Sequence, residues 1–102
     1  MSYLVSVDFP CKEGMAETVE GMLRGALKDT RAFDGCQSID VYFEEDTNTF
    51  TALEVWDSAD HYRVYQKFRT DQGIAEALAP VIEGGWEGVV AAVKWLGPKT
   101  DI

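Results

Sequence analysis

The sequence predicts an α+β fold in which four antiparallel strands and two main helices follow one another in the order βαββαβ. Three observations carry this prediction. Residues 38–43 and 50–56 alternate apolar and polar side chains around a polar turn, which is the pattern of a β-hairpin. One amphipathic helical segment precedes this hairpin and a second follows it. Strand-like segments lie near both ends of the chain, which completes the order of the ferredoxin-like split βαβ unit.

The first two elements are a strand and a helix. Residues 3–8 alternate and are rich in β-formers, so they read as the first strand. Residues 13–32 carry apolar side chains at the spacing of one helical face, with Glu20 and Arg24 placed to pair on the exposed side. Asp34 and Gly35 end this helix.

The hairpin is the clearest local feature. Ile39, Val41 and Phe43 share one face of its first strand, and residues 44–48 form the polar turn. On its second strand, Glu54 and Trp56 share a face, because side chains two residues apart point the same way. The hairpin therefore places a carboxyl group beside a tryptophan on one side of the sheet.

The second half begins with Asp57 and Ser58, which supply a helix N-cap for residues 59–72. The inward stripe of this helix is expected to be His61, Val64, Tyr65 and Phe68. Residues 74–83 read as short helical turns, and residues 86–96 as the last strand. The chain is thus expected to form one domain over residues 1–96, with a frayed tail at 97–102.

Composition and charge exclude several classes of function. The chain has 102 residues, 46% of them hydrophobic, and a formal net charge of −9. Nucleic-acid binding relies on clustered Lys and Arg, which are lacking, and the same acidity disfavours anionic membrane surfaces. No apolar run approaches the roughly 18 residues of a spanning helix, and the N-terminus does not resemble a signal peptide. A cytoplasmic protein without nucleic-acid or membrane partners is expected.

Metal-binding patterns are equally sparse. Cys11 and Cys36 lack the spacing of a zinc or redox motif, and His61 is the only histidine. Both thiols are expected to be reduced and structural. We therefore expect no bound metal ion.

Both faces of the predicted sheet are apolar, although two helices can cover only one of them. The second face includes Leu4, Leu53, Val55, Val89, Ala91, Val93 and Trp95. An apolar face of this size requires a covering layer, and a second copy of the chain is the simplest one. The sequence therefore predicts a homodimer whose two sheets face each other.

The chain resembles the antibiotic biosynthesis monooxygenase family of dimeric α+β barrels. The resemblance rests on Asp34-Gly35-Cys36 after the first helix, on Thr49-Phe50, and on residues 54–58 (Glu-Val-Trp-Asp-Ser) directly before the second helix. It extends in order from Tyr3 to Trp95. The resemblance implies a fold shared with small cofactor-free oxygenases that act on quinol- and anthrone-like substrates, with haem-degrading enzymes, and with proteins of no assigned activity.

The chain departs from the family pattern on its second helix. Tyr65 stands where relatives often carry a histidine, and Thr70 lies near the place of a second one. The haem-degrading branch uses Trp and His at positions that match Tyr65 and Ala75, which could not support a haem in the same way. No nucleotide-binding glycine motif is present either. We accordingly expect no flavin, haem or other cofactor.

Oxygen chemistry without a cofactor needs a base, a hydrogen-bond donor and apolar walls that exclude water, because the deprotonated substrate must itself be the electron donor. An inward-pointing Glu beside a Trp is expected to have a raised pKa, which suits a general base. The predicted catalytic residues are Glu54, Tyr65 and His61. The predicted substrate-binding residues are Tyr42, Trp56, Tyr62, Phe68 and Arg69.

Each of these residues also has a structural interpretation: Glu54 as a paired or capping group, the aromatic residues as core, His61 as a helix-end residue and Arg69 as half of a salt bridge. Three functions therefore remain open. They are a cofactor-independent monooxygenase acting on a quinol- or anthrone-like aromatic, a non-catalytic small-ligand-binding or stress-related homodimer, and a proton-transfer enzyme such as an isomerase or cyclase.

Overall fold

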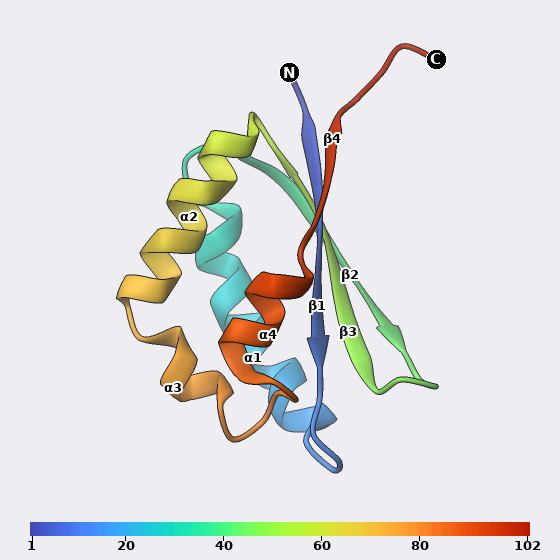
Figure 1. The fold of residues 1–102 in the computed structure, drawn as a ribbon, viewed down its shortest axis with the longest axis vertical. Helices are drawn as coiled ribbons and strands as arrows, with labels where there is room; N and C mark the ends of the chain where they lie inside the picture. Colours follow the sequence, from blue (N-terminus) through green and yellow to red (C-terminus); the bar gives the residue numbers. More distant parts are fainter.

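A four-stranded antiparallel sheet carries all the helices of the chain on one face. The computed structural model describes residues 1–102 (Figure 1). The elements in chain order are β1 (Tyr3–Pro10), α1 (Ala16–Arg31), β2 (Cys36–Glu44), β3 (Thr49–Trp56), α2 (Ala59–Asp71), α3 (Ile74–Leu78), α4 (Gly85–Ala92) and β4 (Lys94–Pro98). The strand order is β2-β3-β1-β4, which confirms the predicted ferredoxin-like α+β fold.

The hairpin fixes the register of the sheet. Phe43 lies opposite Phe50 and Ile39 opposite Glu54, so the two strands pair along almost their whole length. Asn48 closes the turn with a left-handed backbone at φ 54°, a conformation that Asn tolerates better than most residues. β1 adds to the other side of β3, where Val5 lies opposite Glu54. The predicted hairpin and its two faces are confirmed.

Both main helices form where the periodicity places them. The predicted Glu20–Arg24 pair forms on the exposed side of α1 at 2.9 Å. Ser58 caps α2, because its side chain accepts a hydrogen bond from the backbone N–H of His61. The buried side chains of α2 are Tyr62 and Tyr65. The predicted stripe is therefore correct for Tyr65 but wrong for Val64, which is 62% exposed.

The end of the chain differs from the prediction. Residues 86–92, expected to begin the last strand, belong to the helix α4, and β4 is only Lys94–Pro98. The apolar residues Trp86, Val89, Val90 and Val93 recur at helical spacing, and Trp86 and Val89 face the core. Pro98 pairs with Tyr3, so the strand continues two residues beyond the boundary at 96.

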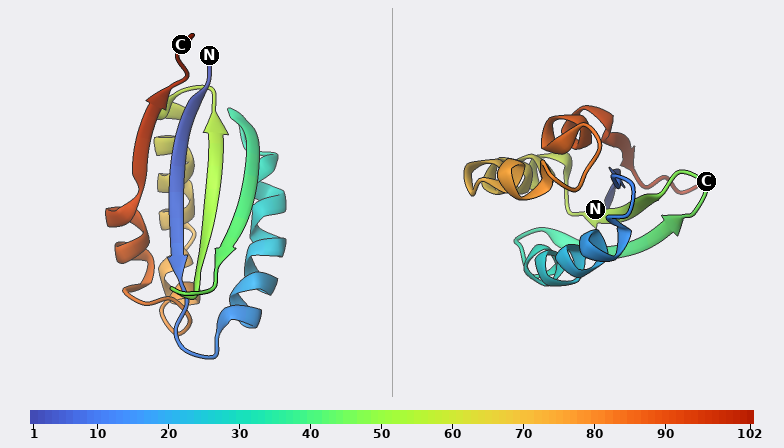
Figure 2. Two further views of the ribbon diagram at one scale, coloured as in Figure 1. Left: turned by 90° about the vertical axis from the view of Figure 1, so that its right-hand side faces the viewer. Right: turned by 90° about the horizontal axis from the view of Figure 1, so that it is seen from below.

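The two faces of the sheet have different surroundings. The helix-covered face carries the core, in which Val5, Ala52 and Trp56 have no measurable exposure. Figure 2 shows the opposite face turned toward the viewer, with the helices behind it. Leu4, Leu53 and Val55 lie on this open face and are only half-buried by their strand neighbours. No helix is long and apolar enough to cross a membrane.

Trp95 belongs to the covered face and not to the open one as predicted. Its ring lies 5.1 Å from that of Tyr62, a buried residue of α2, and 6.5 Å from that of Tyr3. The register of β4 shifts between its pairings with Leu4 and Val5. Because of this irregularity, the side chains of β4 do not alternate regularly between the two faces of the sheet. Val89 and Ala91 belong to α4 and not to the sheet.

Candidate functional site

A cavity of about 280 Å³ lies between the helix-covered face of the sheet and the helices. Its floor is formed by the strands β1 and β3, which contribute Val7, Phe9 and Glu54. The helices α1 and α2 form two walls and contribute Met22, Leu23, Ala26, Leu27, Tyr62, Tyr65 and Arg69.

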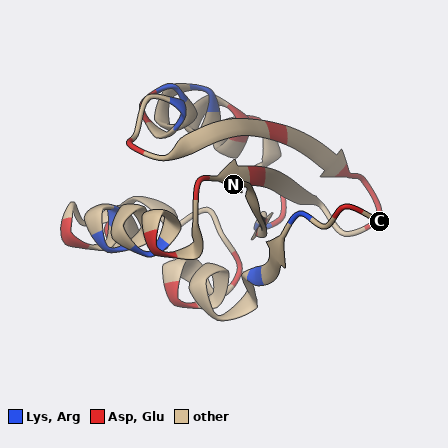
Figure 3. Ribbon diagram, turned by 90° about the horizontal axis from the view of Figure 1, so that it is seen from above, with Lys and Arg blue, Asp and Glu red and all other residues tan.

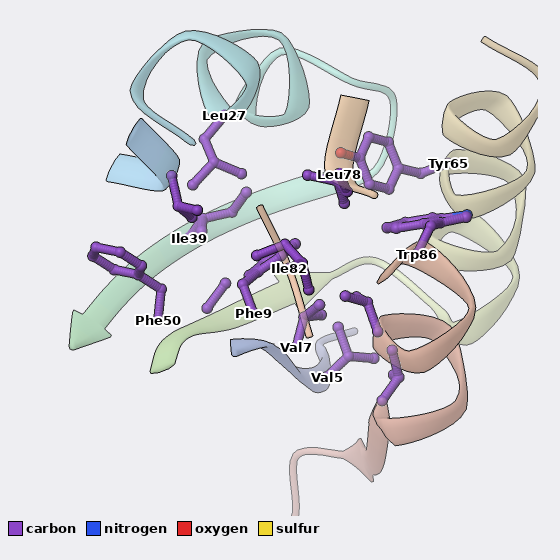
Figure 4. Packing of buried hydrophobic residues seen from close by; sticks show 14 of the residues in the cluster. Val5, Val7, Phe9, Leu27, Ile39, Phe50, Tyr65, Leu78, Ile82 and Trp86 are labelled. Atoms are coloured by element: carbon purple, nitrogen blue, oxygen red, sulfur yellow. The ribbon is translucent and has the colours of Figure 1, made fainter. Parts of the chain in front are cut away.

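The remaining wall comes from α3 and α4. These two helices contribute Ile74, Ala77, Leu78 and Trp86. Figure 4 shows Tyr65, Leu78 and Trp86 converging from three different helices. Trp86 is held in place by a hydrogen bond from its Nε1 to Thr70 Oγ1 at 2.9 Å. Apolar side chains therefore surround the cavity, and Glu54 and Arg69 are its only charged residues.

Glu54 is the only acidic side chain in this cavity and is 3% exposed. Its one hydrogen bond comes from Trp56 Nε1, at 3.1 Å from Oε1. No cationic side chain lies within ion-pair distance of it. Burial raises the pKa of Glu54 to about 7, and the hydrogen bond from Trp56 opposes this rise. A carboxyl group in this state exchanges protons readily at neutral pH, as a general base must.

Aromatic rings enclose the carboxyl group. The Trp56 ring lies 5.7 Å from that of Tyr62 and 5.2 Å from that of Tyr65, although Trp56 itself does not line the cavity. Burial, and to a smaller extent the charge of Glu54, raise the pKa of the Tyr62 hydroxyl. The hydroxyl of Tyr62 therefore stays protonated at neutral pH and can act as a hydrogen-bond donor.

The hydroxyl of Tyr65 is already engaged by its neighbours. It lies 2.6 Å from Thr30 Oγ1, a fully buried side chain of α1, and accepts a hydrogen bond from Arg69 Nε at 2.9 Å. Because Thr30 Oγ1 donates to the carbonyl of Ala26, the Tyr65 hydroxyl donates to Thr30. Burial raises the pKa of Tyr65, which keeps this proton in place. The arrangement ties α2 to α1.

Arg69 extends this connection. One of its terminal nitrogens donates to the Ala26 carbonyl at 2.8 Å and to Thr30 Oγ1 at 3.2 Å. The other terminal nitrogen lies 3.4 Å from Gln72 Oε1. One interpretation of the sequence is that Arg69 forms a salt bridge. This salt bridge does not form, because all of the acceptors that Arg69 contacts are neutral.

Four of the predicted site residues do not line the cavity, and Trp56 is one of them. Tyr42 pairs with Thr51 and therefore points to the open face, opposite to Glu54. His61 faces outward at the start of α2, with Nδ1 2.7 Å from Ser58 Oγ and Nε2 4.0 Å from Asp34. Phe68 is 38% exposed and packs on Phe33 at a ring distance of 5.1 Å. Glu54, Tyr62, Tyr65 and Arg69 are the predicted residues that the fold brings together.

The sequence did not indicate the contributions of α1, α3 and α4. Met22, Leu23 and Leu27 belong to an apolar stripe, which indicates burial but not a cavity. The sequence predicts a strand at Trp86, whereas the structure places this residue on α4, in the wall of the cavity. Thr30 lies at the end of the apolar face of α1. Its side chain is completely buried in the structure, which indicates a polar contact, but the sequence alone does not show this burial.

Metal-ligating side chains do not gather anywhere in the structure. No group of three His, Cys, Asp or Glu side chains lies close enough to hold an ion. Cys11 and Cys36 are both free thiols. Figure 3 shows that basic segments of α1 and α2 alternate with acidic ones, and no basic face is formed.

Comparison with known proteins identifies the family. The sequence profile described as antibiotic biosynthesis monooxygenase matches residues 2–79, which is most of the chain. The chain therefore belongs to the antibiotic biosynthesis monooxygenase family. Among curated proteins, none is similar enough to match.

Solved structures share the fold at low sequence identity. Rv0793 from Mycobacterium tuberculosis has a TM-score of 0.69 at 22% identity, covering 99% of this chain and 98% of its own. SO0527 from Shewanella oneidensis has a TM-score of 0.72 at 16% identity, covering 95% and 90%. PA3566 from Pseudomonas aeruginosa has a TM-score of 0.68 at 21% identity, covering 97% and 94%. These likenesses support the fold.

Proposed function

We propose that this protein is a cofactor-independent monooxygenase that oxidises a small quinol- or anthrone-like aromatic molecule in the cavity above Glu54. The observation that carries the proposal is the placement of one carboxyl group, 3% exposed and without an ion-pair partner, in a mostly apolar cavity. A carboxyl group at a packing position costs free energy, and Val or Leu would fill the space without that cost. Membership of a family that includes monooxygenases agrees with this function.

In the proposed reaction Glu54 takes a proton from an acidic hydroxyl or C–H group of the substrate. The resulting anion transfers an electron to O₂, and the two radicals combine to a peroxide on the substrate carbon. Loss of water then leaves one oxygen atom on the ring as a carbonyl or hydroxyl group. The second oxygen atom leaves as water with two substrate hydrogens, and the substrate supplies all the electrons.

The surrounding side chains have supporting roles in this proposed reaction. The protonated hydroxyl of Tyr62 donates a hydrogen bond to the substrate oxygen on which negative charge develops. The ring of Tyr65 forms an apolar wall beside Trp56, and its hydroxyl keeps α1 and α2 together. Exclusion of water by these walls strengthens every electrostatic interaction within the cavity.

We also propose that the protein functions as a homodimer in the cytoplasm. Leu4, Leu53 and Val55 are half-buried apolar side chains on the open face, beside the polar Ser6 and Asp40, and a second sheet would cover them. The free thiols of Cys11 and Cys36 support a reducing compartment.

A second candidate is a binding protein that uses the same cavity without turnover. The observation that favours it is the engagement of the Tyr65 hydroxyl by Thr30 and Arg69, together with the outward position of His61. Glu54 is then the only proton acceptor that titrates near neutral pH in the cavity. A proton-transfer enzyme would use this same carboxyl group and would need no oxygen.

Oxygen uptake measured with a panel of hydroquinones and anthrones separates these functions. The monooxygenase is expected to consume one O₂ per product, and Glu54→Gln is expected to abolish uptake. Glu45→Gln, at the exposed hairpin turn, is the matched control and should leave uptake unchanged. Product formation without O₂ would refute the monooxygenase and indicate a proton-transfer enzyme. Binding without any turnover would replace it by the binding protein.

A further inference from the structure

Arg69 is a cation without an acidic partner in a chain of net charge −9. Three other basic residues of the helices pair with carboxylates, Arg24 with Glu20, Arg63 with Asp60, and Lys67 with Asp71, whereas Lys28 and Arg31 of α1 do not. Arg69 lies on α2 between the two members of the Lys67–Asp71 pair, yet it forms no salt bridge. Arg69 is instead one of the residues that line the cavity.

The position of the guanidinium group is fixed by neutral acceptors. Tyr65 Oη, the Ala26 carbonyl and Thr30 Oγ1 hold it at 2.9, 2.8 and 3.2 Å. It lies 5.5 Å from the centre of the Tyr65 ring, which restricts it further. These contacts orient the group and leave its positive charge without a counterion. A half-buried charge of this kind is stabilised when an anion binds beside it.

Glu54 and Arg69 mark two separate polar points of one apolar cavity. Glu54 is on β3 at the floor, Arg69 is on α2, and the two do not form an ion pair. A single molecule can therefore meet a proton acceptor at one point and a fixed cation at the other. Its body must be apolar, because the walls between these points are aromatic and aliphatic side chains.

The cavity volume limits the size of that body. A cavity of about 150 Å³ holds one benzene ring. The present cavity of about 280 Å³ therefore has room for about two fused rings. Within the proposed substrates, this size favours a bicyclic quinol over a three-ring anthrone.

We propose that the substrate is a two-ring aromatic carboxylate, whose carboxylate binds Arg69 and whose reacting group faces Glu54. This inference rests on the proposal that the cavity is the ligand site. Four of the five N–H donors of Arg69 are used by Tyr65, Ala26, Thr30 and Gln72. The carboxylate is therefore bound by the one remaining N–H of a terminal nitrogen and by the positive charge that lacks a counterion.

Calorimetric binding of 2-naphthoate and 2-naphthamide tests this inference, because the probes share a body and differ in charge. At about pH 6, below the pKa of Glu54, the carboxylate probe is still ionised. We expect 2-naphthoate to bind at least about tenfold more tightly than 2-naphthamide. Arg69→Gln is expected to remove this preference. Arg63→Gln removes the same charge from α2 outside the cavity and should keep it.

If Arg69→Gln fails to fold, Arg69→Lys provides the test. It retains the positive charge and should retain part of the preference for 2-naphthoate. Equal affinities of the two probes for the wild-type protein would overturn the carboxylate assignment and leave the proposed oxygenation untouched. Preference for 2-naphthoate without any oxygen uptake would instead overturn the oxygenation and support the carboxylate site. Failure of both probes to bind would overturn the inference together with its cavity.

Discussion

Trp56 Nε1 donates a hydrogen bond to Oε1 of Glu54, two residues earlier on the same strand, over 3.1 Å. The contact follows from strand geometry, because alternate residues share a face. It supplies one donor to a carboxylate that can accept several hydrogen bonds. The ionised form of Glu54 is thus incompletely satisfied in its buried position, and this is the physical reason for its raised pKa.

The first prediction is that Glu54 makes the stability of the protein depend on pH. Its pKa is about 7 in the folded protein against a reference value of 4.5, so between these values the folded state binds more protons than the unfolded state. The free energy of unfolding therefore falls as the pH rises from 4.5 to about 7 and then levels off. The loss from Glu54 alone is about 3 kcal/mol.

Denaturant unfolding of the wild-type protein and Glu54→Gln at several pH values measures this contribution. The difference between the two proteins isolates Glu54 from the other acidic residues, which titrate in both. The free energy of unfolding of Glu54→Gln should increase relative to that of the wild type as the pH rises. A constant difference across this range would show that the carboxyl group titrates normally.

The second prediction concerns the hydroxyl of Tyr65. Tyr65→Phe leaves Arg69 Nε without its acceptor and removes one of the three hydrogen bonds of the buried Thr30 Oγ1. We expect a loss of about 1–3 kcal/mol in the free energy of unfolding. Tyr3→Phe is the matched control, because the Tyr3 hydroxyl forms no hydrogen bond and its removal should change stability by less than about 0.5 kcal/mol.

The same Tyr65 variant tests the catalytic role predicted from the sequence. If the hydroxyl serves only to join α1 and α2, the affinity for a naphthalene probe should stay within about twofold once the fraction of folded protein is corrected for. A much larger loss of affinity would show that the Tyr65 hydroxyl takes part in ligand binding.

The third prediction concerns the turn that leads into β2. Gly35 has φ 89°, and a Cβ there would collide with the ring of His61. Gly14 has a similar φ of 77° but open space around it. Gly14→Ala should therefore cost about 1–2 kcal/mol from backbone strain alone. Gly35→Ala should cost at least about 1 kcal/mol more, because overpacking adds to the strain. Equal thermal shifts would mean that His61 moves away freely.

The faces of the central strands could be predicted from the sequence because a strand has a period of two. Phe50, Ala52, Glu54 and Trp56 lie on one face for this reason, and the predicted pairing of Glu54 with an aromatic environment followed directly. The same rule places Tyr42 on the opposite face. The expectation that Tyr42 lined the site failed because it went against that alternation.

The C-terminal part and the cavity wall could not be predicted in the same way. A short apolar run such as residues 86–93 fits both a buried strand and a buried helix, and only packing against β1 decides between them. The connection of Thr30, Tyr65 and Arg69 joins residues up to 39 positions apart. Such contacts depend on how α1 and α2 lie against each other, which no local pattern specifies.

The last prediction concerns the open face of the sheet. Leu53 lies on β3, an inner strand of the sheet, with Ser6 and Asp40 as its neighbours on either side. In a dimer formed through this face its side chain would be buried between two sheets. Leu53→Lys would then bury an ammonium group in the interface, and pairing it with the neighbouring Asp40 would require both charges to be desolvated, at a cost of several kcal/mol. Because the residue points away from the core, the fold of each subunit should be retained.

Sedimentation at micromolar concentration should show the wild-type protein at twice the mass of the 11.4 kDa chain and Leu53→Lys at the mass of one chain. Thr47→Lys adds the same charge at the exposed hairpin turn and should leave the dimer intact. Far-UV circular dichroism should be unchanged in both variants. A wild-type protein that sediments as a single chain would refute the dimer. A Leu53→Lys variant that remains dimeric would show that the interface is on another face, because burying the lysine between two sheets would require it and Asp40 to be desolvated.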